Sequence, residues 1–376
     1  MTTLARKYRP TRLRDLLGQD ALRTSLSAAF AHDRIPQAIL LTGVRGVGKT
    51  TTARIIARSV NCEQGPTEDP CGACTSCREI AGDNSLDVIE MDAASQTGVE
   101  AMRDLIENVS YAPMRAGARK IYILDEAHML STPAWNALLK TLEEPPEHVV
   151  FIFATTEADK IPATIHSRCQ SLVLRRISTE IISGHVQDVA AREGVDLEAG
   201  VAETIARAGG GSMRDALSIL DQAIASAGQP GTRPRVGLDA TRAMLGQAST
   251  GRLVGLLADV ASGKPERLMP SWRGLIEDGA DPLALVDDLS RLIHLSQVAA
   301  CARAHLDPMG LGAEDISVLE KIGTHVGLDT LGAAQAMIFA ARRAIRENPD
   351  RSLAAEIFVM RLNHHFSAAH RARTAA

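Results

Sequence analysis

The sequence predicts a parallel α/β domain that carries a phosphate-binding loop and a metal-binding insertion, followed by two all-α regions. Three observations support this prediction. A glycine-rich loop lies between an apolar run and an alanine-rich segment, four cysteines fall within the next sixteen-residue stretch, and strand-like runs disappear beyond about residue 177. Aromatic residues make up only 3% of the chain, a composition that favours helices over a β-sandwich.

Charge is distributed unevenly along the 376 residues. The net charge is −4, yet residues 1–60 hold eleven Lys and Arg against three Asp and Glu. Such a basic segment can meet the phosphates of a nucleotide or of DNA, and a solvated basic face is the alternative. The sequence has no apolar run of about 18 residues and no signal-like stretch at its start. We therefore expect a cytoplasmic protein without a membrane partner.

Three apolar runs read as buried strands: residues 37–42, 121–124 and 149–154. The first runs through the glycine-rich loop into a predicted helix from about residue 50 to 61. Alternation of strands and helices indicates a parallel sheet. Because ligands bind at the carboxyl ends of such strands, the polar residues that end all three runs are candidates for chemistry.

Helical periods broken by glycines follow the predicted sheet. Residues 226–235 contain Gly and Pro and look like an exposed connection, after which helical patterns resume. We expect an α/β domain over 1–177, a helical domain over 178–242 and a second helical domain over 243–376.

The glycine-rich loop matches the phosphate-loop pattern G-x-x-x-x-G-K-[ST] and has the required strand before it and helix after it. Its glycines let backbone N–H groups point at phosphates, and the helix N-terminus adds its positive dipole end. Lys49 can reach the β- and γ-phosphates, and Thr50 can ligate magnesium. The expected phosphate-binding residues are Gly43, Val44, Arg45, Gly46, Val47, Gly48, Lys49, Thr50 and Thr51.

Two adjacent carboxylates, Asp125 and Glu126, end the second predicted strand. Asp125 can hold Mg²⁺, and Glu126 can orient and deprotonate an attacking water. Neighbouring strand residues point in different directions, so the two side chains can take different roles. The alternative is an ordinary capped strand end, which the upstream phosphate loop disfavours.

Cys62, Cys71, Cys74 and Cys77 lie close enough in sequence to hold one metal ion. Glycines and prolines between them supply the turns that tetrahedral convergence requires. We expect structural zinc in a module over about 61–79, with an iron–sulfur cluster as the metal alternative. Four protein ligands would close the coordination sphere, so catalysis there is not expected.

Further motifs resemble the AAA+ ATPases of clamp loaders. They are the D-E-A-H-like run at 125–128, the strand end Ala154-Thr155-Thr156, the triplet Ser167-Arg168-Cys169 and the run from Gly211 to Ala216. The resemblance implies that Thr155 senses the γ-phosphate, that Arg168 acts as a finger in a neighbouring subunit's site, and that Met213 and Arg214 reach the nucleotide from a helical lid. A surface ion pair is the alternative for either arginine.

The N-terminal stretch Leu4 to Pro10, followed by Leu17-Gly18-Gln19, resembles the family's nucleotide-base box. The resemblance places Ala5, Arg9 and Leu17 beside the adenine and ribose. A simple basic arm is the alternative.

A cysteine module directly after the phosphate-loop helix resembles the gamma/tau subunits of bacterial DNA polymerase III clamp loaders in particular. The resemblance implies an ATP-hydrolysing motor subunit that uses ATP, Mg²⁺ and Zn²⁺ and loads the sliding clamp onto primer–template DNA. Its implied partners are the delta and delta-prime subunits, further gamma/tau copies, the clamp and DNA, with residues 243–376 as an oligomerisation collar.

Longer members of this family continue into segments that bind the helicase and the polymerase, and we expect those activities to be absent here. Two other functions stay open at this point. One is another AAA+ DNA motor such as a branch-migration helicase, and the other is an adaptor that binds ATP without hydrolysing it.

Overall fold

The computed structural model describes residues 3–95, 99–227, 234–247, 250–302, 311 and 313–374. The chain divides into two compact units, each described here by itself. The first comprises Met1–Leu197 and Ile205–Arg235, and the second comprises Glu198–Thr204 and Val236–Ala376. In the parts of the chain just given, no helix combines the length and the apolar character needed to cross a bilayer.

A five-stranded parallel sheet forms the centre of the first unit. In order across the sheet the strands are β2 (Val88–Asp92), β3 (Lys120–Asp125), β4 (Val149–Thr155), β1 (Ala38–Thr42) and β5 (Gln170–Val173). The register aligns Thr42 with Thr155 and Asp92 with Asp125. The carboxyl ends of four strands therefore meet at one edge, where ligands bind in sheets of this kind.

The sequence analysis anticipated β1, β3 and β4 but not β2 and β5. The three anticipated strands are almost entirely buried, so they read as continuous apolar runs. Strand β2 has no fully buried residue, and β5 has one, Leu172. Strands at the two edges of a sheet bury less surface and leave a weaker apolar signal.

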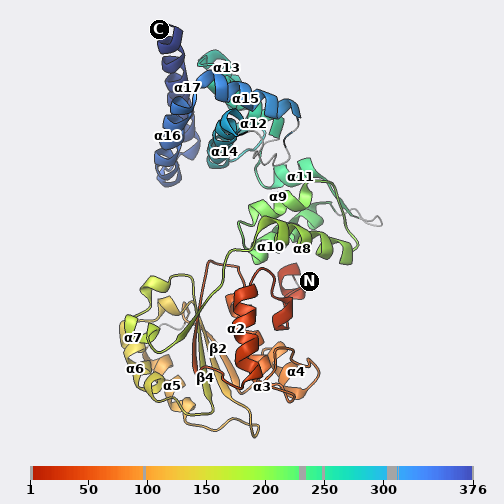
Figure 1. Ribbon diagram of the computed structural model, residues 1–376, viewed down its shortest axis with the longest axis vertical. Coiled ribbons are helices and arrows are strands. Elements are labelled where there is room, and N and C mark those ends of the chain that lie inside the picture. Colours follow the sequence, from red (N-terminus) through yellow and green to blue (C-terminus); the bar gives the residue numbers. More distant parts are fainter. Residues whose placement is uncertain are drawn as a thin grey trace. The chain divides into compact units, whose positions relative to one another are not determined.

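Helices cover both faces of the sheet (Figure 1). α2 (Asp20–Ala31) and α3 (Lys49–Asn61) pack on the face to which Ile39 and Leu41 point, and α5 (Val99–Val109) and α6 (Thr132–Glu143) pack on the face of Leu40. Alternate strand residues thus enter different cores, as the two-residue period of a strand requires. The predicted α/β fold class is confirmed.

The remaining elements of the first part of the chain are short or follow the sheet. Before and between the strands lie α1 (Leu4–Lys7), η1 (Leu13–Asp15), α4 (Thr75–Ala81), η2 (Ala127–Met129), η3 (Ala158–Lys160) and α7 (Ala163–His166). After β5 come α8 (Thr179–Arg192), α9 (Val201–Ala208) and α10 (Met213–Ala227). Two-residue strands β6 (Asp196–Leu197) and β7 (Arg235–Val236) pair in a small separate sheet that the sequence did not reveal.

Helices also make up the C-terminal part of the chain. They are α11 (Leu238–Met244), α12 (Thr250–Ala261), α13 (Pro265–Glu277), α14 (Pro282–Cys301), α15 (Ala313–Val326), α16 (Leu328–Glu347) and α17 (Arg351–Thr374). The apolar faces of α12 to α17 share one core, in which Trp272 and Leu289 are completely buried. The expected all-α character of this region is confirmed.

Candidate functional site

The phosphate loop connects β1 to α3, and its backbone uses conformations that favour glycine. Gly46 has a φ of 77° and Gly48, the N-cap residue of α3, a φ of 106°. Residues with a side chain rarely adopt such backbone angles, because their Cβ atom would approach the backbone too closely. The loop therefore delivers Lys49 and Thr50 as the first residues of α3, whose N-terminal N–H groups have no partner within the helix.

Gly46 also lies against the start of α10. A Cβ atom at this position would meet Ser212 Oγ at 1.8 Å, and the Arg214 N–H donates to the Gly46 carbonyl at 3.4 Å. Ser212 is buried and its hydroxyl accepts from the Asp215 N–H at 3.2 Å. The phosphate loop and the helix that carries Arg214 are thus in direct contact.

Lys49 is buried, with its ammonium group held by the loop itself. Nζ donates to the carbonyls of Gly43 at 3.0 Å and Val44 at 3.1 Å. Burial lowers the pKa of Lys49, and Arg214 lowers it further, while Glu126 and Asp125 oppose the shift. A bound polyanion would favour the charged ammonium, so the environment suits a phosphate ligand.

Oxygen atoms suited to magnesium lie beside Lys49. The Thr50 hydroxyl donates to Asp125 Oδ2 at 2.5 Å, and Asp125 Oδ1 accepts from the Glu126 N–H at 3.0 Å. Magnesium prefers oxygen ligands about 2.0–2.1 Å away in an octahedron, so two of its ligands must lie close to each other. Thr50 and Asp125 fit such an ion, which would supply charge compensation for transferring phosphates.

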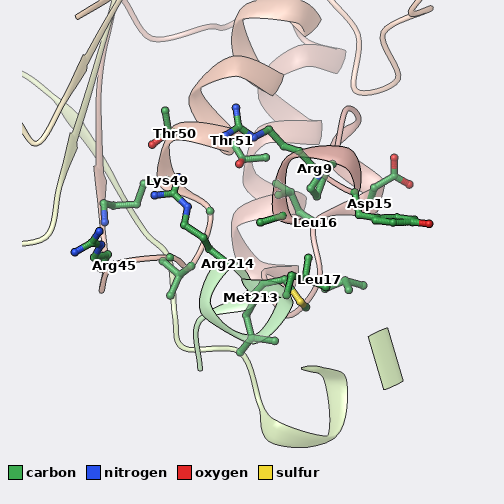
Figure 2. Close-up of a pocket in the computed structure, with 18 of the residues that line it drawn as sticks. Arg9, Asp15, Leu16, Leu17, Arg45, Lys49, Thr50, Thr51, Met213 and Arg214 are labelled. Atoms are coloured by element: carbon green, nitrogen blue, oxygen red, sulfur yellow. The ribbon is translucent and has the colours of Figure 1, made fainter. Parts of the chain in front are cut away.

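These groups line one pocket with an empty volume of about 900 Å³, which includes open solvent. Figure 2 shows Lys49 and Thr50 at one end, Leu16 and Leu17 at the other, and Arg214 extending toward Lys49. The expected site residues that line it are Ala5, Arg9, Leu17, Arg45, Gly46, Val47, Gly48, Lys49, Thr50, Thr51, Asp125, Glu126, Met213 and Arg214.

The pocket also contains residues that were not among the expected ones. They are Tyr8, Pro10, Asp15, Leu16, Ile177, His185 and Leu217. Tyr8 and Pro10 belong to the N-terminal stretch that had been singled out, so extending that motif by its neighbours would have found them. His185 and Leu217 come from α8 and α10 and carry no local signal, because only packing brings those helices to the loop.

The N-terminal arm, residues Leu4 to Pro10, is hydrogen-bonded to α10 and to the end of α8. Glu193, at the end of α8, accepts from Lys7 Nζ at 2.6 Å and from the Tyr8 hydroxyl at 2.5 Å, and the Leu4 N–H donates to Asp221 at 3.4 Å. The Lys7 and Tyr8 hydrogen bonds hold the pKa of the Glu193 carboxyl below its usual value. Tyr8, which lines the pocket, is therefore linked to the end of α8.

Arg9 lies half-buried in the same pocket. Burial lowers the pKa of its guanidinium, and the nearby cations Arg54 and Arg214 add to this effect. The phosphate-loop end of the pocket and the N-terminal arm therefore share an excess of positive charge that an anionic ligand would neutralise.

Four of the residues expected at the nucleotide site do not line the pocket. Gly43 and Val44 face Lys49 only through their carbonyls. Thr155 is completely buried, where its hydroxyl lies 3.1 Å from His128 Nδ1 and accepts from the Glu157 N–H at 3.0 Å. Arg168 follows α7, forms an ion pair with Glu143 and donates to the Thr164 carbonyl at 2.7 Å. Within this chain Arg168 is therefore engaged in a local ion pair.

The four cysteines converge around the turn before α4. Their Sγ atoms all lie within 4.8 Å of one another. Zinc–sulfur bonds of about 2.3 Å in a tetrahedron place sulfurs about 3.8 Å apart, so a small contraction would complete such a site. The N–H groups of Cys71, Cys74 and Cys77 donate to the sulfurs of Cys62, Cys71 and Cys74 at 3.3–3.4 Å.

The surroundings of the cluster suit thiolate ligands. Backbone N–H groups of Cys74 and Ala73 lower the pKa of the Cys71 thiol to about 6, whereas burial raises the pKa of the Cys77 thiol to about 12, so a bound cation would be needed to hold Cys77 as a thiolate. Arg58 is 8% exposed, its Nε has no hydrogen-bond partner among the residues that the structure describes, and its Nη2 lies 3.6 Å from where a Cβ of Gly72 would stand. Buried positive charge beside the turn at Gly72, between Cys71 and Cys74, fits a negatively charged metal–thiolate centre.

A parallel sheet with a phosphate loop, an acidic strand end and a helical segment that reaches the loop defines a P-loop ATPase of the AAA+ class. Three family profiles match consecutive parts of the sequence: DNA polymerase III, delta subunit, over 18–178, DNA polymerase III clamp loader subunit, ATPase lid domain, over 181–229, and DNA polymerase III subunits gamma and tau domain III over 236–375. The chain belongs to the gamma/tau family of DNA polymerase III clamp-loader subunits.

Similar curated proteins carry the same family name. DNA polymerase III subunit tau of Salmonella typhimurium is 39% identical over 362 residues, which are 95% of this chain and 54% of that protein. The tau subunit of Bacillus subtilis is 43% identical over 288 residues, 76% of this chain and 50% of that protein. The chain therefore spans about half the length of these relatives.

A solved structure of the Thermotoga maritima RuvB branch-migration motor covers 66% of this chain and 78% of its own, with 20% identity and a TM-score of 0.48.

Proposed function

We propose that this protein is an ATP-binding and ATP-hydrolysing motor subunit of a replicative clamp loader. The observation that carries the proposal is the meeting of Lys49, Thr50, Asp125, Glu126 and Arg214 in one pocket. Phosphoryl transfer needs positioning and charge compensation more than covalent chemistry from the protein. This pocket combines both with an apolar end suited to a base.

Each residue has a proposed role. The loop from Gly43 to Thr51 wraps the phosphates, and Lys49 neutralises the β- and γ-phosphates. Thr50 and Asp125 would hold Mg²⁺, which would supply charge compensation for the phosphates when bound. Glu126 receives the proton of the attacking water.

The other end of the pocket would bind the nucleoside. Ala5, Arg9 and Leu17 lie on the base and ribose side, and Met213 and Arg214 contact the nucleotide from α10. Thr155 is proposed to sense the γ-phosphate. Since Thr155 bonds to His128 in the present structure, that role would require the strand end to rearrange when nucleotide binds.

Assembly would complete the site. We propose that Arg168 enters the active site of a neighbouring subunit, where its planar guanidinium can stabilise the charge that develops on the γ-phosphate. The Glu143 ion pair would have to open or be shared for this to happen. Hydrolysis would then depend on the assembled loader, whose proposed members are the delta and delta-prime subunits and further gamma/tau copies.

The domain assignment follows the same scheme: an ATPase domain over 1–177, a lid over 178–242 and an oligomerisation collar over 243–376. The cysteine module over about 61–79 would hold one Zn²⁺ for structural purposes. ATP would favour an assembly that grips the sliding clamp and primer–template DNA in the cytoplasm, and hydrolysis would release both.

Measurement of ATP turnover with and without the sliding clamp and primed DNA tests this proposal. A clamp-loader subunit in its assembly should hydrolyse ATP faster when both are present. A branch-migration helicase would instead separate or move DNA strands without the clamp, and a non-hydrolysing adaptor would bind ATP with no turnover in any mixture. Either of these two results would refute the proposal.

A further inference from the structure

The last turn of α3 contains a buried cation, the guanidinium of Arg58. Arginine is almost never buried in proteins unless its charge is paired. Among the residues that the structure describes, no carboxylate forms an ion pair with Arg58, and its Nε has no hydrogen-bond partner. A buried charge without a partner is costly, because it loses hydration and gains nothing in return. The position therefore requires a negative group nearby.

Two carboxylates of the cysteine module are already paired with other arginines. Glu63 Oε1 lies 3.6 Å from Arg115 Nη1. The carboxylate oxygens of Asp69 lie 3.2 Å from Arg12 Nε and 3.3 Å from Arg14 Nη1. These acidic side chains therefore do not supply the negative partner that the buried guanidinium needs.

The guanidinium of Arg58 lies against the turn that carries the cysteine sulfurs. Its Nη2 is 3.6 Å from the place where a Cβ atom of Gly72 would stand. Gly72 directly follows Cys71, has a φ of 73°, and provides a backbone hydrogen bond to the buried Cys77 thiol. The cation thus contacts the same short turn that contacts the sulfurs.

The end of α3 explains why a cation is needed at this place. Cys62 is the C-cap residue of α3, and the carbonyls at a helix C-terminus carry partial negative charge. A Zn²⁺ ion held by four thiolates is also negatively charged, since two positive charges meet four negative ones. The helix end and such a centre would repel each other. Arg58 lies about one helical turn before Cys62 and offsets this repulsion.

We propose that Arg58 is the internal counterion of the zinc–thiolate centre and a determinant of its zinc affinity. The inference rests on the proposed structural zinc, and it extends that site from the four cysteines to the residue that balances their charge. The guanidinium stabilises the anionic metal-bound state, whereas in the metal-free protein it stays buried without a partner. Zinc binding and the charge of Arg58 therefore stabilise each other.

Zinc affinity of variants of the full chain, measured by competition with a chromophoric chelator, tests this inference. Arg58→Met keeps the aliphatic stem but removes the charge, and it should weaken zinc binding about tenfold, as loss of an outer-shell partner does. Arg58→Lys keeps the charge and should retain most of the affinity. Arg119→Met is the matched control, because Arg119 is also half-buried but pairs with Asp33, outside the cysteine module. It should bind zinc with the parent affinity.

The thermal midpoint, measured with and without zinc, separates charge compensation from packing. In the zinc-loaded protein Arg58→Met should lower the midpoint, because the anionic centre loses its counterion. In zinc-free protein the same substitution should leave the midpoint at or above that of the parent, because it removes an unpaired buried charge. Arg58→Gln, which is also neutral but can donate hydrogen bonds, serves as the neutral variant if Arg58→Met does not fold.

The inference is overturned if the neutral variant binds zinc as tightly as the parent. It is also overturned if the substitution lowers the midpoint equally with and without zinc, since that result would indicate a packing role alone. A parent chain that binds no zinc would refute the zinc assignment itself, and the inference would fail with it.

Discussion

Substitution of Gly46 by alanine should disconnect the phosphate loop from the helix that carries Arg214. The new Cβ would stand 1.8 Å from Ser212 Oγ, so that oxygen would have to move by about 1.6 Å to reach ordinary contact at 3.4 Å. Ser212 is buried and caps α10, so its displacement would also move Arg214. Gly46→Ala is therefore expected to weaken ATP binding as well as the fold.

The loss of folding free energy expected for Gly46→Ala has two contributions. A left-handed backbone at alanine costs about 1–2 kcal/mol, and overpacking against a buried neighbour costs about 1–3 kcal/mol. Gly117 provides a matched control, because its φ of 80° is close to the 77° of Gly46 and a Cβ there meets nothing within 4 Å. Gly117→Ala should show only the backbone contribution and should leave nucleotide affinity intact.

Titration with an ATP analogue measures the effect. Gly46→Ala should raise the Kd for the analogue roughly tenfold or more, which corresponds to about 1.4 kcal/mol, whereas Gly117→Ala should not change it. Adding Ser212→Gly to Gly46→Ala removes the obstructing side chain and should recover part of the affinity. Equal affinities for Gly46→Ala and Gly117→Ala would refute the reasoning.

Three further outcomes are expected. Purified protein should contain about one zinc per chain, and removing it should lower the thermal midpoint without changing ATP affinity; freshly purified protein that holds no metal would contradict the cysteine assignment. Arg168→Ala should bind ATP normally but lose about 10³-fold or more of clamp- and DNA-stimulated hydrolysis, and mixing it with Lys49→Ala should restore some turnover if the arginine acts across an interface. Ile357→Asp, at a position of α17 that is 54% exposed and apolar, should weaken self-association or partner binding measured by light scattering, whereas an unchanged mass would argue against the collar.

Much of the fold could be predicted because its signals are local. A phosphate loop with a buried strand before it and a helix after it is a short continuous pattern, and the acidic pair stands at the end of a buried run. β2 and β5 escaped prediction because edge strands of this sheet bury few residues. The two-residue strands β6 and β7 are too short to show a period.

Residues that depend on tertiary packing could not be predicted in the same way. His185 and Leu217 enter the pocket only because α8 and α10 fold over it, and no motif marks them. Likewise, the sequence shows two threonines at the end of β4 but not that the hydroxyl of Thr156 is the one that donates to Glu126. The ion pair of Arg168 could not be predicted either, since its partner Glu143 lies 25 residues away in sequence.

ATP hydrolysis by variants of the two central residues tests the account most directly. In the assembled loader with clamp and primed DNA, Lys49→Ala should fail to bind ATP, because the charge that compensates the phosphates is lost. Glu126→Gln should bind ATP with the parent affinity yet lose about 10²-fold or more of the turnover, because the shape remains but the base is gone. Turnover at the parent rate by Glu126→Gln would contradict the assignment of the base and with it the proposed mechanism.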